Sequence, residues 1–267
     1  MSENLVLFDA HAHYDDERFA EEFPGGTDGV IAHVHENGVC GIINIGASVR
    51  SSRTSLALAE RYDFIYAAVG IHPGDAQRIP LGNDEGAIAE IEAMAAHPKA
   101  VAIGEIGLDY HYDGTDRERQ AWFFERQLCL SEKLDMPVII HDRDAHGDCF
   151  DMLKRHPDAY GVFHSFSGSA EMARQLVDMG WYISFSGPVT YKNAAKVKEA
   201  CAIVPEDRIL VETDAPYLPP VPHRGKLNHS GYLHYTAEVV AELRNVTPEE
   251  IAAVTIANTR RLFRITE

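Results

Sequence analysis

Long apolar runs are missing from this 267-residue sequence, and so is any close pair of cysteines. No segment approaches the roughly 18 consecutive apolar residues that a membrane-spanning helix needs, and the start MSENLVLFDA has no basic segment ahead of a signal-like apolar stretch. We therefore expect a cytoplasmic protein that does not associate with membranes. Four widely separated cysteines argue against a disulfide framework and a structural zinc knuckle: Cys40, Cys129, Cys149 and Cys201.

Basic residues are scarce as well. Lys and Arg number 24 against 41 Asp and Glu, which gives a formal net charge of −17. This balance is the reverse of the basic surface expected of a duplex-DNA binder. A phosphate-containing substrate would have to be held locally, by metal ions or by a few clustered cations. The 45% hydrophobic and 24% charged fractions are those of an ordinary globular protein with a sizeable core, so disorder is not expected.

Short β-branched runs alternate with longer helical patterns along the whole chain, and no linker interrupts them. The runs suit strands buried on both faces, as in a parallel sheet, and are predicted at 5–9, 41–45, 64–70, 100–105, 137–141, 161–164, 181–185 and 208–212. Eight strands, each followed by a helix, predict an α/β fold, a single (β/α)8 barrel domain over residues 1–267. An open doubly wound sheet is the alternative. The barrel is favoured because Asp9-Ala-His-Ala-His13 stands where a nucleotide-binding sheet carries a glycine-rich loop.

Two helix starts are legible in the sequence. Thr115 followed by Glu118 predicts a capping box for a helix that ends near Leu134. Thr247, Pro248 and Glu250 predict an N-cap, a proline in the first turn and a capping-box acid for a last helix that runs to about residue 263.

Residue types that carry chemistry fall where predicted strands end. They are His11 and His13 after the first strand, Glu105 at the fourth, His141 at the fifth, His164 at the sixth, and Glu212 and Asp214 at the eighth. In α/β barrels the carboxyl ends of different strands supply the catalytic groups. Because side chains alternate along an extended chain, His11 and His13 point the same way and can accept one cation. Buried ionisable groups are costly unless they are paired or bind metal, so this constellation favours a metal centre over core packing.

Neutral imidazoles bind borderline divalent metals, and a carboxylate such as Glu105 can bridge two ions. Two ions about 3.5–4 Å apart lower the pKa of a water between them towards about 7 and polarise a phosphoryl or carbonyl oxygen. Asp214 is then placed to accept the proton of that water. The sequence therefore predicts a hydrolase in which Asp214 and Glu105 are catalytic.

Eight motifs, in order along almost the whole chain, carry a family resemblance. They are FDAHAH at 8–13, GIHP at 70–73, AIGEIGLDY at 102–110, MPVIIHDR at 136–143, FHSFSG at 163–168, YISFSGP at 182–188, ETDAPYLPP at 212–220 and NTRRLF at 258–263. With these motifs the chain resembles the TatD-type metal-dependent deoxyribonucleases, within the amidohydrolase-like barrels. The resemblance implies removal of nucleotides from 3′ ends of DNA, single-stranded DNA included, with no obligate protein partner.

The same resemblance implies a centre of two divalent ions, which can be zinc, manganese or magnesium. It assigns His11, His13 and Asp214 to one ion and His141 and His164 to the other, with Glu105 as the bridge. That assignment agrees with the placement of these residues at predicted strand ends.

Residues beside these ligands are candidates for binding substrate. His72 follows the third strand and either contacts the substrate or holds the Pro73 turn. Glu212 lies two residues before Asp214, so the alternation aims it at the same site. Asp9 either orients an imidazole or caps the strand end.

Three cations lie where a phosphate would be bound. Arg143 follows the fifth strand, and Arg224 and Lys226 lie in the loop after the last strand. Departures from the family pattern at His229, Gly231 and Ser165 touch no predicted metal ligand and bear on substrate preference.

Two other functions fit the same residues. The first is hydrolysis of an ester or amide bond, such as aminoacyl-tRNA deacylation, since some relatives of the family are thought to act on mischarged aminoacyl-tRNA. The second is a non-catalytic binding or scaffold protein that retains the barrel.

Overall fold

The computed structural model describes residues 5–266, and its strands form one eight-stranded sheet in the order β1 to β8. The chain divides into two compact units, one of Met1–Asn44 with His164–Glu267 and one of Ile45–Phe163. That all of residues 1–267 form one domain stays a prediction.

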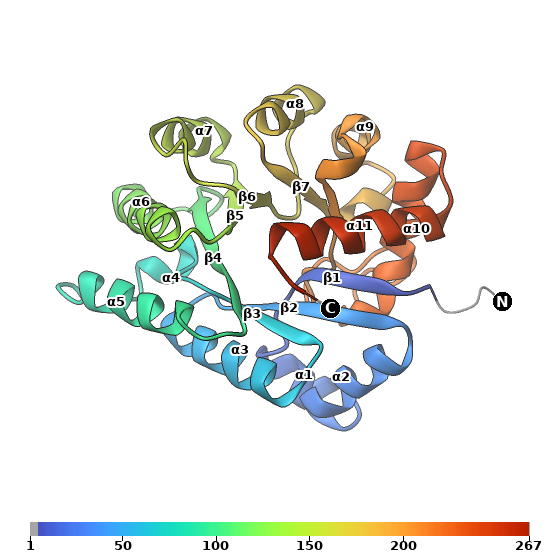
Figure 1. Cartoon of the computed structure of the whole chain (residues 1–267), viewed down its shortest axis with the longest axis horizontal. Helices are drawn as coiled ribbons and strands as arrows, with labels where there is room; N and C mark the ends of the chain where they lie inside the picture. The colour runs from blue at the N-terminus through green and yellow to red at the C-terminus, as the bar shows by residue number, and fades with distance from the viewer. Residues whose placement is uncertain (1–4, 267) are drawn as a thin grey trace. The chain divides into compact units, whose positions relative to one another are not determined.

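The first unit combines an N-terminal and a C-terminal part of the described residues. Its elements are β1 (Leu7–Ala12), α1 (Glu17–Glu22), α2 (Gly26–Glu36), most of β2 (Val39–Ile45), α8 (Ala170–Asp178), β7 (Tyr182–Phe185), η1 (Gly187–Thr190), α9 (Ala195–Ile203), η2 (Glu206–Arg208), β8 (Ile209–Val211), η3 (Ser230–Tyr232), α10 (Leu233–Arg244) and α11 (Pro248–Leu262) (Figure 1). β1 pairs in parallel with β2, and β7 pairs in parallel with β8. A parallel bridge from Ala12 to Ala215 joins β1 to the chain just beyond β8, so the first and last strands meet.

The second unit holds the middle of the chain. Its elements are α3 (Val49–Arg61), β3 (Ile65–Val69), α4 (Pro73–Ala76), α5 (Asp84–Ala95), β4 (Ala100–Asp109), α6 (Arg117–Leu134), β5 (Val138–Arg143), α7 (His146–Arg155) and β6 (Gly161–Phe163) (Figure 1). β3, β4, β5 and β6 pair in parallel, each with the next. Consecutive parallel strands, each followed by helix, make the (β/α)8 barrel that the sequence predicts.

Local sequence explains where the helices begin. Ser48 caps α3 and Thr247 caps α11, each with a reciprocal capping box, and Pro248 stands in the first turn of α11 as predicted. The predicted cap of α6 was wrong. Asp116 is the N-cap and accepts from the Arg119 N–H at 3.0 Å. The Thr115 hydroxyl instead donates to the Tyr112 carbonyl at 2.8 Å, so the helix begins one residue later than predicted, with a carboxylate as its cap.

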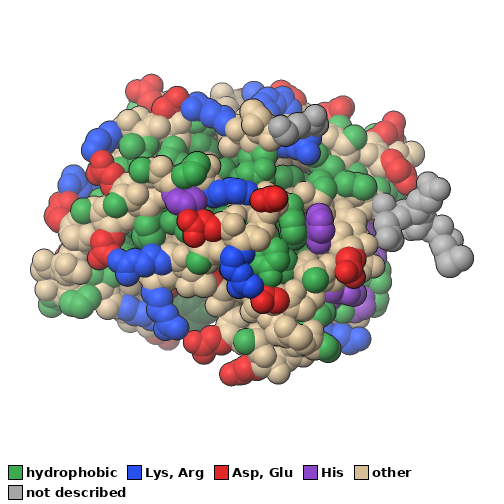
Figure 2. Space-filling view, turned by 60° about the horizontal axis from the view of Figure 1, so that its bottom comes forward, with side chains coloured by type: hydrophobic (Ala, Val, Ile, Leu, Met, Phe, Trp, Pro, Cys, Tyr) green, Lys and Arg blue, Asp and Glu red, His purple; other side chains and the backbone are tan. Residues whose placement is uncertain are grey.

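Apolar side chains of the strands and of the buried helix faces make up the core, and all six residues of β1 are buried. The four cysteines are free thiols. Among residues 5–266, no helix combines the length and the apolar character that crossing a membrane requires. On the face drawn in Figure 2, basic and acidic side chains are interspersed and neither sign forms a continuous patch.

Candidate metal centre

Two neighbouring histidines and an aspartate converge at the end of β1. The Nε2 atoms of His11 and His13 are 3.1 Å apart, and Asp214 Oδ1 lies 3.6 Å from the first and 3.5 Å from the second. His11 is fully buried, and the His13 and Asp214 side chains are each 13% exposed. The alternation of β1 thus directs both imidazoles to one point, as the i, i+2 spacing predicts.

Asp214 reaches this point because the chain turns sharply beyond β8. Its φ is 57°, in the left-handed region that aspartate tolerates better than most residues. Its N–H donates to the His11 carbonyl at 2.9 Å, and the His13 N–H donates to the Ala215 carbonyl at 2.7 Å. These bonds hold the two strand ends together, so a backbone that only a few residue types adopt directs the carboxylate towards the imidazoles.

The donor set fits a divalent ion. Two nitrogens at about 2.0–2.1 Å from one tetrahedral ion lie about 3.3 Å apart, close to the 3.1 Å between the imidazoles of His11 and His13. Two imidazoles with a carboxylate are ligands typical of zinc, manganese or iron.

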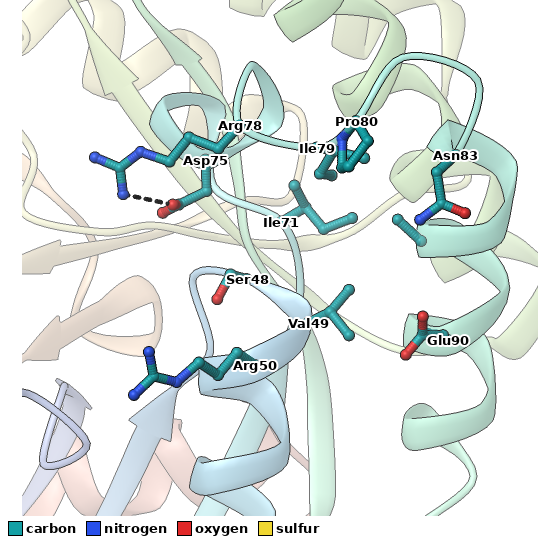
Figure 3. A pocket seen from close by; sticks show the side chains of 11 residues that line it. Ser48, Val49, Arg50, Ile71, Asp75, Arg78, Ile79, Pro80, Asn83 and Glu90 are labelled. Atoms are coloured by element: carbon teal, nitrogen blue, oxygen red, sulfur yellow. Dashed lines mark hydrogen bonds and ion pairs between the residues drawn. The ribbon is translucent and has the colours of Figure 1, made fainter.

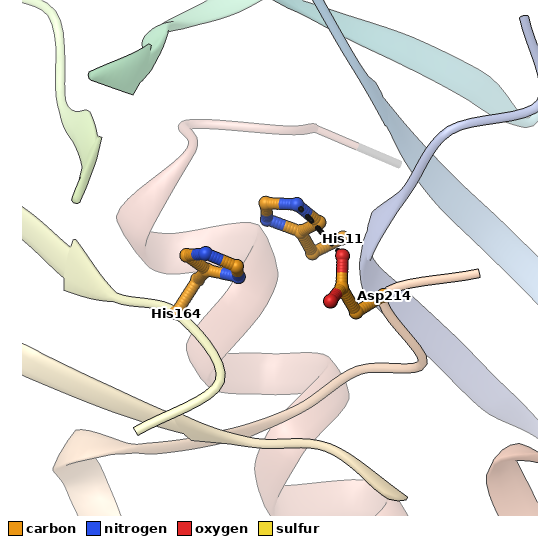
Figure 4. A group of neighbouring side chains, drawn as sticks. All are labelled: His11, His164 and Asp214. Carbon is orange, nitrogen blue, oxygen red and sulfur yellow. Dashed lines mark ion pairs between the residues drawn. The ribbon is translucent and has the colours of Figure 1, made fainter. Parts of the chain in front are cut away.

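A third imidazole lies against this pair. The His164 ring stacks on the His11 ring with centroids 4.0 Å apart and planes 11° apart, and His11, His164 and Asp214 each offer a ligand atom within 4.8 Å of the others (Figure 4). Glu212, 1% exposed, holds His164 in place: Oε1 accepts from His164 Nδ1 at 3.2 Å and from the Ser165 N–H at 2.7 Å. Glu212, predicted to bind substrate, therefore contacts a predicted metal ligand. We call His11, His13, His164 and Asp214 the His11 group.

A buried carboxylate supports the His11 group from behind. Asp9 Oδ1 accepts from the backbone N–H groups of His11 at 3.2 Å and Thr213 at 2.9 Å. Its Oδ2 accepts from the hydroxyls of Thr213 at 2.5 Å and Ser230 at 2.6 Å. Burial raises the pKa of Asp9 to about 6, although these four donors oppose the shift. Asp9 thus positions the backbone on which the ligands stand.

The second unit gathers its own ligand types at the ends of β4 and β5. His141 Nδ1 lies 2.7 Å from Glu105 Oε1, and His141 Nε2 lies 3.2 Å from Asp109 Oδ2. Glu105 and Asp109 are 3% and 4% exposed. A neutral imidazole has a single N–H, so it serves one carboxylate as a donor and keeps the other nitrogen as a metal ligand. His72, Asp109 and His141 also offer ligand atoms within 4.8 Å of one another. We call Glu105, Asp109, His141 and His72 the Glu105 group.

Asp109 is a site residue that the sequence reasoning missed. It lies four residues after Glu105 on β4, so both side chains point the same way, and this alternation was the signal available in the sequence. Although burial raises the pKa of Asp109, hydrogen bonds from His141 and the His111 N–H outweigh it and leave the pKa below its usual value. Gly107 lies between Glu105 and Asp109 and has a φ of 139°. A Cβ there would lie 2.0 Å from the His141 carbonyl oxygen, so only glycine lets β4 lie this close to β5.

His72 combines the two roles considered for it. Its Nδ1 accepts from the Gly74 N–H at 2.9 Å, which caps α4, and its Nε2 lies 3.8 Å from Glu105 Oε1. Ile71 and Asp75, which flank His72 in the sequence, line a pocket of about 250 Å³. The first residues of α3 line the same pocket (Figure 3).

The three predicted phosphate-binding cations lie on the surface. Arg143, exposed at the end of β5, contacts the Tyr112 hydroxyl at 3.4 Å. The Arg224 guanidinium lies 4.4 Å from the Tyr191 ring centroid, and Lys226 is exposed two residues on. In the first unit, Arg224 and Lys226 share the loop that follows Asp214.

Buried histidines and carboxylates at the ends of parallel barrel strands define a metal-dependent hydrolase class. A profile of the family described as "TatD related DNase" matches residues 8–264. The metal-dependent hydrolase YabD of Bacillus subtilis is 44% identical over 97% of this chain and 100% of its own, and TatD of Mycobacterium tuberculosis is 36% identical over 96% and 97%. The crystal structure of the TatD homologue YjjV from Escherichia coli matches with a TM-score of 0.90 at 33% identity, over 99% of this chain and 100% of that one.

The chain belongs to the TatD-related DNase family, as its motifs predicted. It is a metal-dependent hydrolase, and thus an enzyme rather than the scaffold protein that its sequence left open.

Proposed function

We propose that the protein is a deoxyribonuclease that removes nucleotides from the 3′ end of DNA by hydrolysing phosphodiester bonds. The observation that carries the proposal is the gathering of five histidines with carboxylates at strand ends, in the His11 group and the Glu105 group. The family description, TatD related DNase, supports the choice of DNA.

The proposed reaction needs two divalent ions. His11, His13 and Asp214 would hold one ion, His141 and His164 would hold the other, and Glu105 would bridge them. Such ions polarise the phosphoryl oxygen and lower the pKa of the attacking water.

The protein's own groups complete the reaction. The Asp214 carboxylate accepts the proton of the attacking water, whose oxygen forms a bond to phosphorus as the bond from phosphorus to the 3′ oxygen breaks. The shortened chain keeps the 3′ oxygen, which takes up a proton, and a 5′-nucleotide leaves. Glu212 keeps His164 oriented through the Nδ1 contact of 3.2 Å, and Asp109 does so for His141 at 3.2 Å.

Because the chain has a net charge of −17, it needs cations close to the site to bind a negatively charged DNA strand. Arg143, Arg224 and Lys226 bind phosphates of the substrate, and His72 contacts the phosphate that is cleaved. Because acidic residues outnumber basic ones by 41 to 24, we expect a substrate strand to be held at few points rather than along a basic track.

The test is an activity screen of the purified enzyme, loaded in turn with magnesium, manganese and zinc. Single-stranded DNA labelled at its 5′ end should shorten stepwise, with mononucleotides as the product. Glu105→Gln should abolish this activity, whereas Glu118→Gln, an exposed change in the first turn of α6, should leave it intact. Circular dichroism shows whether both variants fold.

An aminoacyl-tRNA and a simple carboxylic ester belong in the same screen. If the enzyme hydrolyses either compound while DNA stays intact with all three metals, the protein is an acyl hydrolase and not a nuclease. Full activity of Glu105→Gln would remove the bridging role from Glu105.

A further inference from the structure

Exposed apolar side chains gather in the loop that directly follows Asp214. Tyr217, Leu218 and Val221 are 46%, 37% and 44% exposed, and they are three of the eight large hydrophobic side chains exposed within residues 5–266. Single exposed apolar residues need no explanation, but a cluster beside a reactive site marks a binding surface. We call Tyr217, Leu218 and Val221 the Tyr217 patch.

Tyr217 is a neighbour of the His11 group. Its ring centroid lies 6.0 Å from that of His13, with the planes at 82°, and its N–H donates to the Asp214 carbonyl at 2.8 Å. A molecule bound through a reacting phosphate at His13 and Asp214 would therefore have its adjoining groups beside this ring.

A small polar cluster fixes the ring. The Tyr217 hydroxyl donates to Asp16 Oδ2 at 3.1 Å, and Arg18 donates to both carboxylate oxygens of Asp16, at 3.0 and 2.9 Å. The Arg18 guanidinium carbon lies 4.4 Å from the Tyr217 ring centroid. The ring is held in one orientation even though nearly half of it faces solvent.

The backbone of the loop is equally constrained. Asn228 Nδ2 donates to the Tyr217 carbonyl at 2.6 Å and to the Thr213 carbonyl at 2.9 Å. Leu218 has a φ of 49°, which is unfavourable for leucine, and its carbonyl packs on Gly187, where a Cβ would lie 2.0 Å from the oxygen. These contacts fix the backbone of the loop on two sides. The side chains of the Tyr217 patch are therefore exposed because the loop backbone holds them towards solvent.

Charge on the same loop identifies the occupant. Arg224 and Lys226 follow the Tyr217 patch within nine residues and are exposed. An exposed aromatic ring with cations beyond it is a combination with which proteins bind single-stranded nucleic acid, because a base stacks on the ring and phosphates meet the cations.

We propose that the Tyr217 patch binds the base of the 3′-terminal nucleotide, with the ring of Tyr217 stacked on that base and Leu218 beside it. This subsite rests on the phosphodiesterase activity proposed above.

An abasic substrate tests the stacking. We would compare an oligonucleotide that carries its 3′-terminal base with one that has an abasic sugar there, both as single strands. For the unmodified enzyme, kcat/KM should fall by about 5- to 150-fold on loss of the base, which is the worth of one base–aromatic stack. In Tyr217→Ala this ratio should collapse towards one, through a loss on the base-carrying substrate alone. Tyr217→Phe should keep the ratio, because the ring remains.

Val246→Ala is the matched control, since Val246 is 41% exposed in the turn between α10 and α11, and it should keep the ratio of the unmodified enzyme. If Tyr217→Ala lowers kcat/KM equally on both substrates, Tyr217 only supports the fold of the site and the subsite is refuted while the nuclease stands. If the unmodified enzyme cleaves neither oligonucleotide, the proposed function fails and the subsite fails with it.

Discussion

We expect His229 to make the protein sensitive to acid, and a single substitution to remove that sensitivity. Its side chain is 7% exposed and lies against the ring of Tyr232, with centroids 4.0 Å apart. Among the described residues, its Nδ1 has no hydrogen-bond partner. Burial lowers its pKa to about 4, and repulsion from neighbouring imidazoles adds to the shift: those of His33, His223 and His234. The folded protein therefore keeps this ring neutral at pH 7.

The magnitude follows from proton linkage. The pKa is about 4 in the folded chain against 6.5 for an unperturbed histidine. As the pH falls below 6.5, His229 takes up a proton in the unfolded chain but not in the folded chain, and this favours unfolding. The stability that depends on a neutral His229 is therefore complete above pH 6.5 and is lost by about pH 4. A difference of about 2.5 pKa units, at 1.36 kcal/mol each, corresponds to about 3 kcal/mol.

Urea unfolding of the metal-free protein at about pH 7 and about pH 4 measures this loss. His229→Gln removes the titration, so between these two pH values the free energy of unfolding of the variant should fall by about 3 kcal/mol less than that of the unmodified protein. His111→Gln, at an exposed position, is the control and should behave as the unmodified protein. A difference below about 1 kcal/mol would show that His229 is not held neutral by burial, and the reasoning would be wrong.

Three further outcomes test the site and the fold. Glu212→Gln weakens the acceptor of His164 Nδ1 and should lower metal affinity by about 10- to 100-fold in titration calorimetry; unchanged affinity would separate Glu212 from the metal. Removing metal with a chelator should lower the thermal midpoint by about 5–10 °C relative to protein with ion at 100 times its Kd, because binding at that level contributes about 2.7 kcal/mol; no shift on adding the ion back would argue against a built site. Thr247→Ala should lower the free energy of unfolding by about 1 kcal/mol in urea and Thr247→Ser by much less, since only alanine abolishes the capping box of α11.

The strands were predictable because burial on both faces leaves continuous apolar runs in the sequence. The run predicted at 41–45 is β2, Val39–Ile45, and the run predicted at 181–185 is β7, Tyr182–Phe185. β4 extends to Asp109, four residues beyond the predicted end. Glu105 interrupts the apolar run there, yet pairing with β5 continues to Arg143, so hydrogen bonding to the neighbouring strand decides where β4 ends.

The functional and capping residues also divide into those that local spacing predicts and those that it does not. The histidines and Asp214 were predictable from their spacing, since alternation along a strand is a local rule. The cap of α6 was not, because Thr115 and Asp116 are both good N-cap residues and the competition between them is settled by which side chain reaches the Arg119 N–H.

Asp9 shows why the remainder depends on the closed sheet. Its position two residues before His11 suggested either an imidazole partner or a strand cap, and both are short-range interactions. In the fold its carboxylate also accepts from Thr213, 204 residues away, and from Ser230, 221 residues away. No periodicity reports such bonds, because they exist only once β1 meets the end of β8. Asp9 accepts from four donors and thereby holds the backbone of His11 beside the chain segment that carries Asp214. The candidate metal ligands therefore come together only when the first strand pairs with the chain beyond the last strand.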